Sequence, residues 1–171
     1  NLKKLREINN FYLISWTVLN KLNINSLGNL AEFIQRQIRP DLIYFSFLQL
    51  IGKAKLNQQK VFINYNELAQ KVEKIFALPK EITDKVFFTK GPLCALGRYR
   101  RNLSNYSFET ENCKDFTFQD ICSICNQKKD CLGIDRLFNK NIMEVSPFYL
   151  FKPDFLKISF GYSPGLSKPP H

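Results

Sequence analysis

Apolar residues recur at helical spacing through much of the first eighty positions of this chain. Between residues 2 and 22 they fall three or four positions apart, which places them along one stripe of a helix. A second helix is expected from Ser26 or Asn29 to Arg39, because Pro40 cannot continue it. The first forty residues are therefore predicted to form two helices.

A third helix is expected to begin after Asn64, with Glu67 three positions later as in a relaxed capping box, and to end near Ala77. The segment 42–50 is apolar almost continuously and fits either a buried helix or a strand. Beyond residue 80 the pattern breaks into turns and short apolar runs. The sequence thus predicts a mainly α fold with basic N-terminal helices, extended irregular segments and a Pro/Gly-rich C-terminal tail.

Positive charge is spread unevenly along the 171 residues, which carry a formal net charge of +10. Residues 1–60 contribute +6, residues 61–101 contribute +4 and residues 146–171 contribute +2, whereas residues 102–145 carry −2. An excess of Lys and Arg suits a polyanion, because each neutralised phosphate releases counterions. The alternative is a solvated basic surface on an ordinary soluble domain.

Several classes of protein are disfavoured by what the sequence lacks. Hydrophobic residues make up 44% and aromatic residues 14%, which is too much for a disordered chain. No apolar run reaches the roughly 18 residues of a membrane helix, and no secretory signal is visible. There is no phosphate loop and no Ser/His/Asp ordering, and the only histidine is His171. We therefore expect neither an enzyme, nor a small-molecule substrate, nor a membrane partner.

Three separated stretches share a likeness to one family. Residues 72–83 read as a helix that ends in Leu-Pro and is followed by a basic, an acidic and a hydroxyl residue. Cys94–Arg100 contains a Gly-Arg turn, and residues 161–171 contain Pro-Gly-Leu, a lysine and a closing ring. In this order they resemble the small-subunit ribosomal protein of the universal S-fourteen family, in its bacterial and organellar form. Some members hold zinc with two cysteines at the second turn, but here Leu96 and Gly97 stand where the second cysteine would fall, so Cys94 is not expected to be a ligand.

The resemblance implies a small RNA-wrapped domain that scaffolds the head of the small ribosomal subunit near the decoding region. Its partners would be small-subunit rRNA and neighbouring ribosomal proteins. The Lys-, Asn-, Ile- and Phe-rich composition is typical of AT-rich organellar genomes, which adds the mitochondrial matrix as the location. The chain then divides into a basic helical N-terminal extension (1–60), a first family-like part (61–101), a Cys-rich insertion (102–145) and a second family-like part with the tail (146–171).

Basic residues around the family-like turn are the candidates for RNA contact. Three arginines beside Tyr99 can pair phosphates bidentately while the ring stacks on an unpaired base. Phe87 and Phe88 are instead expected to fill a small core. The predicted RNA-binding residues are Lys80, Lys85, Lys90, Arg98, Tyr99, Arg100, Arg101, Lys152 and Lys168.

Four of the five cysteines lie within nineteen residues, in the spacing C-x8-C-x2-C-x5-C. A Cys-x-x-Cys turn lets two thiolates reach one metal, so Cys113, Cys122, Cys125 and Cys131 are predicted to bind one zinc. Free thiols and an iron–sulfur cluster are the alternatives, since the run 121–131 also resembles a three-Cys loop of the large electron-input subunit of respiratory complex I. The second hypothesis for function is therefore a metal-binding accessory subunit of a mitochondrial respiratory complex.

Overall fold

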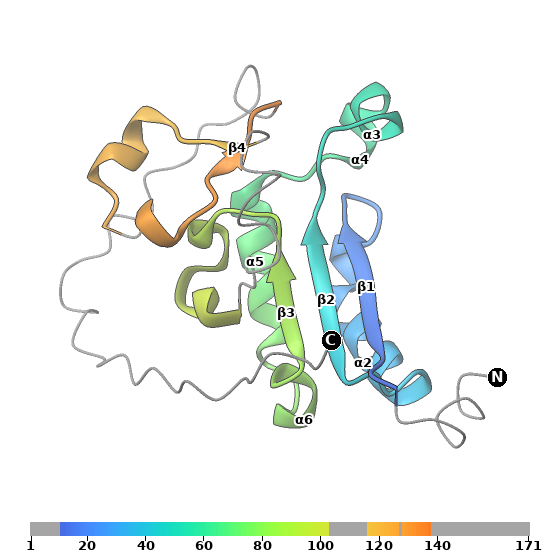
Figure 1. Ribbon diagram of the computed structural model, residues 1–171. Coiled ribbons are helices and arrows are strands. Elements are labelled where there is room, and N and C mark those ends of the chain that lie inside the picture. Colours follow the sequence, from blue (N-terminus) through green and yellow to red (C-terminus); the bar gives the residue numbers. More distant parts are fainter. Residues whose placement is uncertain (1–10, 103–115, 127, 138–171) are drawn as a thin grey trace.

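A parallel β-sheet is the centre of the computed structural model, which describes residues 11–102, 116–126 and 128–137 (Figure 1). Strands β1 (Ile14–Leu19), β2 (Leu42–Phe47) and β3 (Val86–Thr89) lie side by side in that order. Parallel neighbours need crossover connections, and helices α2 (Leu27–Gln37) and α5 (Tyr65–Ile75) lie in the two crossovers. The two helices contact each other, and both pass behind the strands in Figure 1, so the described helices cover one face of the sheet.

The hydrophobic core lies between the sheet and these two helices. Alternate residues of each strand point toward it, because successive side chains of a strand face opposite sides. Phe45 and Phe88 are fully buried there and lie 5.8 Å apart, measured between ring centroids. The helices contribute residues at three- and four-residue spacing, namely Leu27, Ala31 and Ile34 from α2 and Leu68, Val72 and Ile75 from α5.

The prediction of a mainly α fold is wrong, because the described residues combine helices with a parallel and an antiparallel sheet. The error begins in the segment 2–22, whose apolar residues also fit a helix stripe. Within it the run Ile14–Leu19 alternates exposed and less exposed side chains and pairs with β2, in register from Ile14 opposite Leu42 to Leu19 opposite Phe47. Strand pairing between distant segments overrode the local pattern. The segment 42–50, left undecided from sequence, is the central strand β2.

Two of the expected helices are confirmed. Helix α2 follows Ser26 and ends before Pro40, as the proline predicts. At the start of α5 the backbone N–H of Glu67 donates to Asn64 Oδ1 over 2.7 Å, which is the predicted cap. No helix among the described residues is long and apolar enough to cross a membrane.

Shorter elements complete the described structure. A separate two-stranded antiparallel sheet follows the parallel sheet in the chain. In it Phe116 pairs with Asp135, and Thr117 pairs with Ile134. The core cluster runs from Leu19 to Ile134, so it joins the first sixty residues to the segments that follow. The short elements are η1 (Ile24–Ser26), α3 (Lys53–Leu56), α4 (Gln58–Val61), α6 (Lys80–Thr83), η2 (Leu93–Asn102), β4 (Phe116–Thr117), η5 (Asp120–Ile124), η6 (Lys128–Asp130) and β5 (Ile134–Asp135).

Candidate functional site

The sheet face opposite α2 and α5, called here the outer face, exposes large apolar side chains. On β1 the outward residues Ile14, Trp16 and Val18 are 45%, 50% and 44% exposed. A sheet side that faces water normally alternates apolar-in with polar-out, so three exposed apolar residues in a row depart from that pattern. Large exposed apolar patches mark interaction sites.

Three aromatic rings cross the outer face in one row, here called the aromatic column. The strand register places Trp16 beside Tyr44 and Tyr44 beside Phe87. The first pair stacks with ring centroids 5.1 Å apart at 15°, and the second with centroids 5.7 Å apart at 29°. Because β1 is an edge strand, Trp16 ends the column, and among the described residues its ring stacks on Tyr44 alone.

Tyr12 continues the outer face toward the start of β1. Its side chain is exposed, and its pKa is raised first by partial desolvation and then by the charges of Asp41 and Tyr44. Asp41 also accepts a hydrogen bond from the backbone N–H of Leu13 over 2.7 Å, which fixes where the chain enters the sheet. Tyr12 and Tyr44 therefore lie near each other, and the Tyr12 hydroxyl stays neutral at physiological pH.

Positive side chains lie at both ends of the strands. Lys21 follows β1 and Arg39 precedes β2, and both are exposed. Lys85 Nζ donates to the carbonyl of Pro40 over 3.2 Å, and Lys90 Nζ donates to Gln49 Oε1 over 3.0 Å. The last two lysines thus tie neighbouring segments of the sheet together.

The predicted RNA-binding residues fall into three groups. Lys80 is exposed at the start of α6, whereas Lys85 and Lys90 are half-buried and donate to protein oxygens as described. The backbone of residues 98–101 lies in η2, so the basic turn follows β3 closely in the chain. Lys152 and Lys168 lie outside the described residues. Of the two phenylalanines expected in the core, Phe88 is buried, while Phe87 stands on the outer face.

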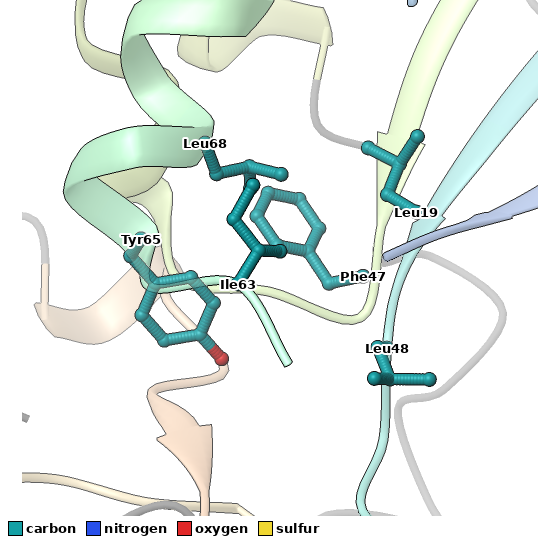
Figure 2. Close-up of a pocket in the computed structure, with 6 residues that line it drawn as sticks. All are labelled: Leu19, Phe47, Leu48, Ile63, Tyr65 and Leu68. Atoms are coloured by element: carbon teal, nitrogen blue, oxygen red, sulfur yellow. The ribbon is translucent and has the colours of Figure 1, made fainter. Parts of the chain in front are cut away.

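An apolar pocket lies at the other side of the sheet, beside the start of α5. Figure 2 shows its six lining residues, Leu19, Phe47, Leu48, Ile63, Tyr65 and Leu68. Burial raises the pKa of Tyr65 well above its ordinary value, with a further upward contribution from Asp135, so its hydroxyl stays protonated. A pocket with one neutral hydroxyl and otherwise apolar walls offers no acid–base pair.

The described cysteines gather in a second place, between η2 and the turns that follow β4. Cys94, Cys122, Cys125 and Cys131 are half-buried and form no disulfide. Backbone N–H groups of Leu93 and Gly133 donate to Cys131 Sγ over 3.4 and 3.3 Å. Cys113, one of the predicted zinc ligands, lies outside the described residues. No group of three or more His, Cys, Asp or Glu side chains in the described ranges is already arranged to hold a metal ion.

Comparison with known proteins found no match: no family model, no curated protein and no solved structure matches this chain. The residues that sequence reasoning missed are Trp16 and Tyr44. Their signal is present in the sequence, since Ile14, Trp16 and Val18 alternate with Ser15 and Thr17 at the period of a strand.

Proposed function

We propose that this protein binds single-stranded RNA as a structural, non-catalytic component of the mitochondrial small ribosomal subunit. The aromatic column on the outer face is the observation that carries RNA binding. A row of stacked rings on a sheet face that ends in an exposed ring is a surface on which an unpaired base can stack. The family resemblance of residues 72–83 and 94–100 supports the choice of particle.

Trp16 is the ring on which a base would stack. Tyr44 already has a ring on both sides, whereas Trp16 and Phe87 end the column on the two edge strands. Of these two end rings, Trp16 is half exposed and Phe87 is more buried. A base that continues the column from Trp16 would gain about 1–3 kcal/mol from stacking. Exposed cations at the strand ends, Lys21 and Arg39, and Lys80 on α6 would bind the phosphates on either side of that base.

Charge favours RNA over a protein partner for this face. Residues 11–102, which build the sheet and its helices, contain 14 Lys and Arg against 6 Asp and Glu. A polyanion gains from this excess through counterion release, and a neutral protein surface does not. The outer face therefore combines the two features that single-strand binding requires, a positive surround and aromatic rings.

Trp16 also provides the test, because it is the only tryptophan in the chain. Titration of the full chain with a 12-mer oligoadenylate is expected to quench its fluorescence as adenine stacks on the indole. Trp16→Ala should weaken binding about 5- to 150-fold, measured by anisotropy of labelled RNA, and Trp16→Phe should retain most of it. Phe33→Ala, which removes an exposed ring from α2, is the matched control and should bind as the unmodified protein does.

Two outcomes would overturn RNA binding at this face. One is an unchanged fluorescence spectrum with RNA at saturation. The other is equal affinity of Trp16→Ala and Phe33→Ala. If the face instead docks another protein, RNA at saturation leaves the indole emission unperturbed and Trp16→Ala binds RNA as Phe33→Ala does.

The particle is tested separately, by sedimentation of mitochondrial extract before and after nuclease treatment. The protein should sediment with the small ribosomal subunit and be released when its rRNA is digested. Sedimentation with a detergent-solubilised respiratory complex would overturn the ribosomal assignment while leaving RNA binding to be judged by the titration.

A further inference from the structure

Two separate segments of the chain meet at Cys131. The backbone N–H of Leu93, at the start of η2, donates to Cys131 Sγ over 3.4 Å. This hydrogen bond joins residues 38 positions apart and brings the next residue, Cys94, beside the same sulfur. The N–H of Gly133 donates to that sulfur from the other direction over 3.3 Å. Two N–H donors on one sulfur are the support that a thiolate ligand requires.

Cys122 and Cys125 are held in a tight turn in the same region. The N–H of Cys125 donates to the carbonyl of Cys122 over 3.2 Å, at the end of η5. Further turn hydrogen bonds continue from Lys128 to the carbonyl of Cys125, and from Cys131 to the carbonyl of Lys128, each over 3.3 Å. The three cysteines therefore lie on one series of hydrogen-bonded turns, which limits their separation.

The four sulfurs also share one electrostatic neighbourhood. Burial raises the pKa of the Cys94 thiol to about 12, and three other thiols add to the rise, those of Cys131, Cys122 and Cys125. Burial likewise raises the pKa of Cys131, while its two N–H donors oppose the rise. These three thiols act on Cys94 because they lie near it, and a divalent cation bound between the sulfurs would favour the thiolate forms.

The segment that carries three of these cysteines has little else to hold it. Strands β4 and β5 have two residues each, and η5 and η6 are single turns of 3₁₀ helix. Among its described hydrophobic side chains only Phe116 and Ile134 are buried, and Phe118, Ile124 and Leu137 are exposed. Small apolar-poor units of this kind are commonly stabilised by a structural metal, whose binding energy is folding energy.

We propose that Cys94, Cys122, Cys125 and Cys131 together form one four-thiolate zinc site. Cys94 takes the place that the spacing of the sequence assigned to Cys113. Four thiolates favour tetrahedral zinc, at Zn–S distances of about 2.3 Å. Because the side chains are not yet arranged to hold a metal, binding draws the turns at 122–131 toward Cys94.

Zinc binding here is a proton-releasing step. The four thiols give up four protons to solvent as Zn²⁺ forms four bonds to sulfur, which leaves the centre with a net charge of −2. Lys128, Lys129 and Arg136 of the same segment are equal in number to Asp120, Asp130 and Asp135, so residues 116–137 add no net charge to the centre. Lys128 Nζ lies 5.2 Å from the centre of the Phe118 ring. This site uses none of the residues of the aromatic column, so the zinc proposal can be correct or wrong independently of RNA binding.

Elemental analysis of the full chain, purified with a reductant and dialysed against zinc-free buffer, tests the ligand set. About one zinc per chain is expected in the unmodified protein and in Cys113→Ser, and less than a tenth of an equivalent in Cys94→Ser. Cys113→Ser is the matched control, since it removes a thiol from the same part of the sequence. Zinc retained in Cys94→Ser but lost in Cys113→Ser would overturn the proposal.

A second measurement requires no variant and so does not depend on folding of a mutant. The native protein is alkylated with and without a zinc chelator, and the modified cysteines are identified by mass spectrometry. Cys94, Cys122, Cys125 and Cys131 should be protected until zinc is removed, while Cys113 reacts in both samples. Protection of Cys113 and reaction of Cys94, a disulfide between any two of the four, or iron with labile sulfide in place of zinc would each refute the site.

Discussion

The α/β unit at residues 11–91 and the cysteine segment at residues 116–137 are stabilised by different means. In the α/β unit β2, β3 and both long helices bury apolar faces, β1 adds Leu19 to the same core, and Phe45, Phe88 and Val72 are fully buried. The cysteine segment has two-residue strands and single turns, with two buried apolar side chains among those described. Fixing each residue costs about 1–2 kcal/mol of backbone entropy, which apolar burial can offset in the first region but not in the second.

The difference shows how function can be separated within one short chain. Because the core of the α/β unit lies on one side of the sheet, none of its side chains on the outer face is needed for that core, and this is the face that we propose for RNA. The cysteine segment contributes Ile134 to the edge of that core, places the buried Asp135 against Tyr65, and is joined to η2 by the hydrogen bond from the Leu93 N–H to Cys131 Sγ. The α/β unit is thus stabilised by its own apolar core, whereas we attribute the order of the cysteine segment to metal binding.

The largest effect is expected from loss of a core ring in the α/β unit. Phe88→Ala should lower the free energy of unfolding by about 3–5 kcal/mol, because it leaves a cavity between sheet and helices. Phe87→Ala removes the adjacent ring from the outer face and should cost less than about 2 kcal/mol. Urea unfolding followed by circular dichroism measures both. If both substitutions lower the free energy of unfolding by the same amount, the two faces of β3 do not differ in burial.

An intermediate effect is expected in the cysteine segment. Gly133 has φ +83°, and an added Cβ would overlap the carbonyl oxygen of Thr117, so Gly133→Ala is strained by about 1–3 kcal/mol. The strain should weaken the N–H contact to Cys131 and speed alkylation of that thiol, while the main unfolding transition stays in place. Gly28→Ala, where an added Cβ meets nothing within 4 Å, is the control. Global destabilisation by Gly133→Ala would mean that the two regions unfold together.

The smallest effect is expected at the start of α5. Asn64→Ala removes the side-chain acceptor of the Glu67 N–H and should cost about 1 kcal/mol. Asn25→Ala changes an exposed asparagine of η1 and should leave stability within about 0.5 kcal/mol. Both changes in the free energy of unfolding are measured on the α/β unit, and neither substitution should alter the alkylation rate of Cys131. A change in that rate would show that the helix and the cysteine segment are coupled.

Local chemistry predicted the helices well. The capping pair at Asn64 and the proline at position 40 act within one or two turns, so their consequences can be read from neighbouring residues. The strand at Ile14–Leu19 could not be distinguished from a helix in the same way. Ile14–Leu19 forms a strand because it pairs with β2, and its first residue, Ile14, lies opposite Leu42, 28 positions further along the chain.

The sequence by itself determined which residues were available for chemistry: an excess of Lys and Arg, many aromatic residues and a group of cysteines with one Cys-x-x-Cys pair. Only the tertiary structure decided which of them meet. Trp16, Tyr44 and Phe87 come from three strands, and Cys94 reaches Cys131 across 37 positions of sequence. Such groupings depend on strand register and on the packing of segments far apart in the chain, and neither is encoded in the spacing of nearby residues.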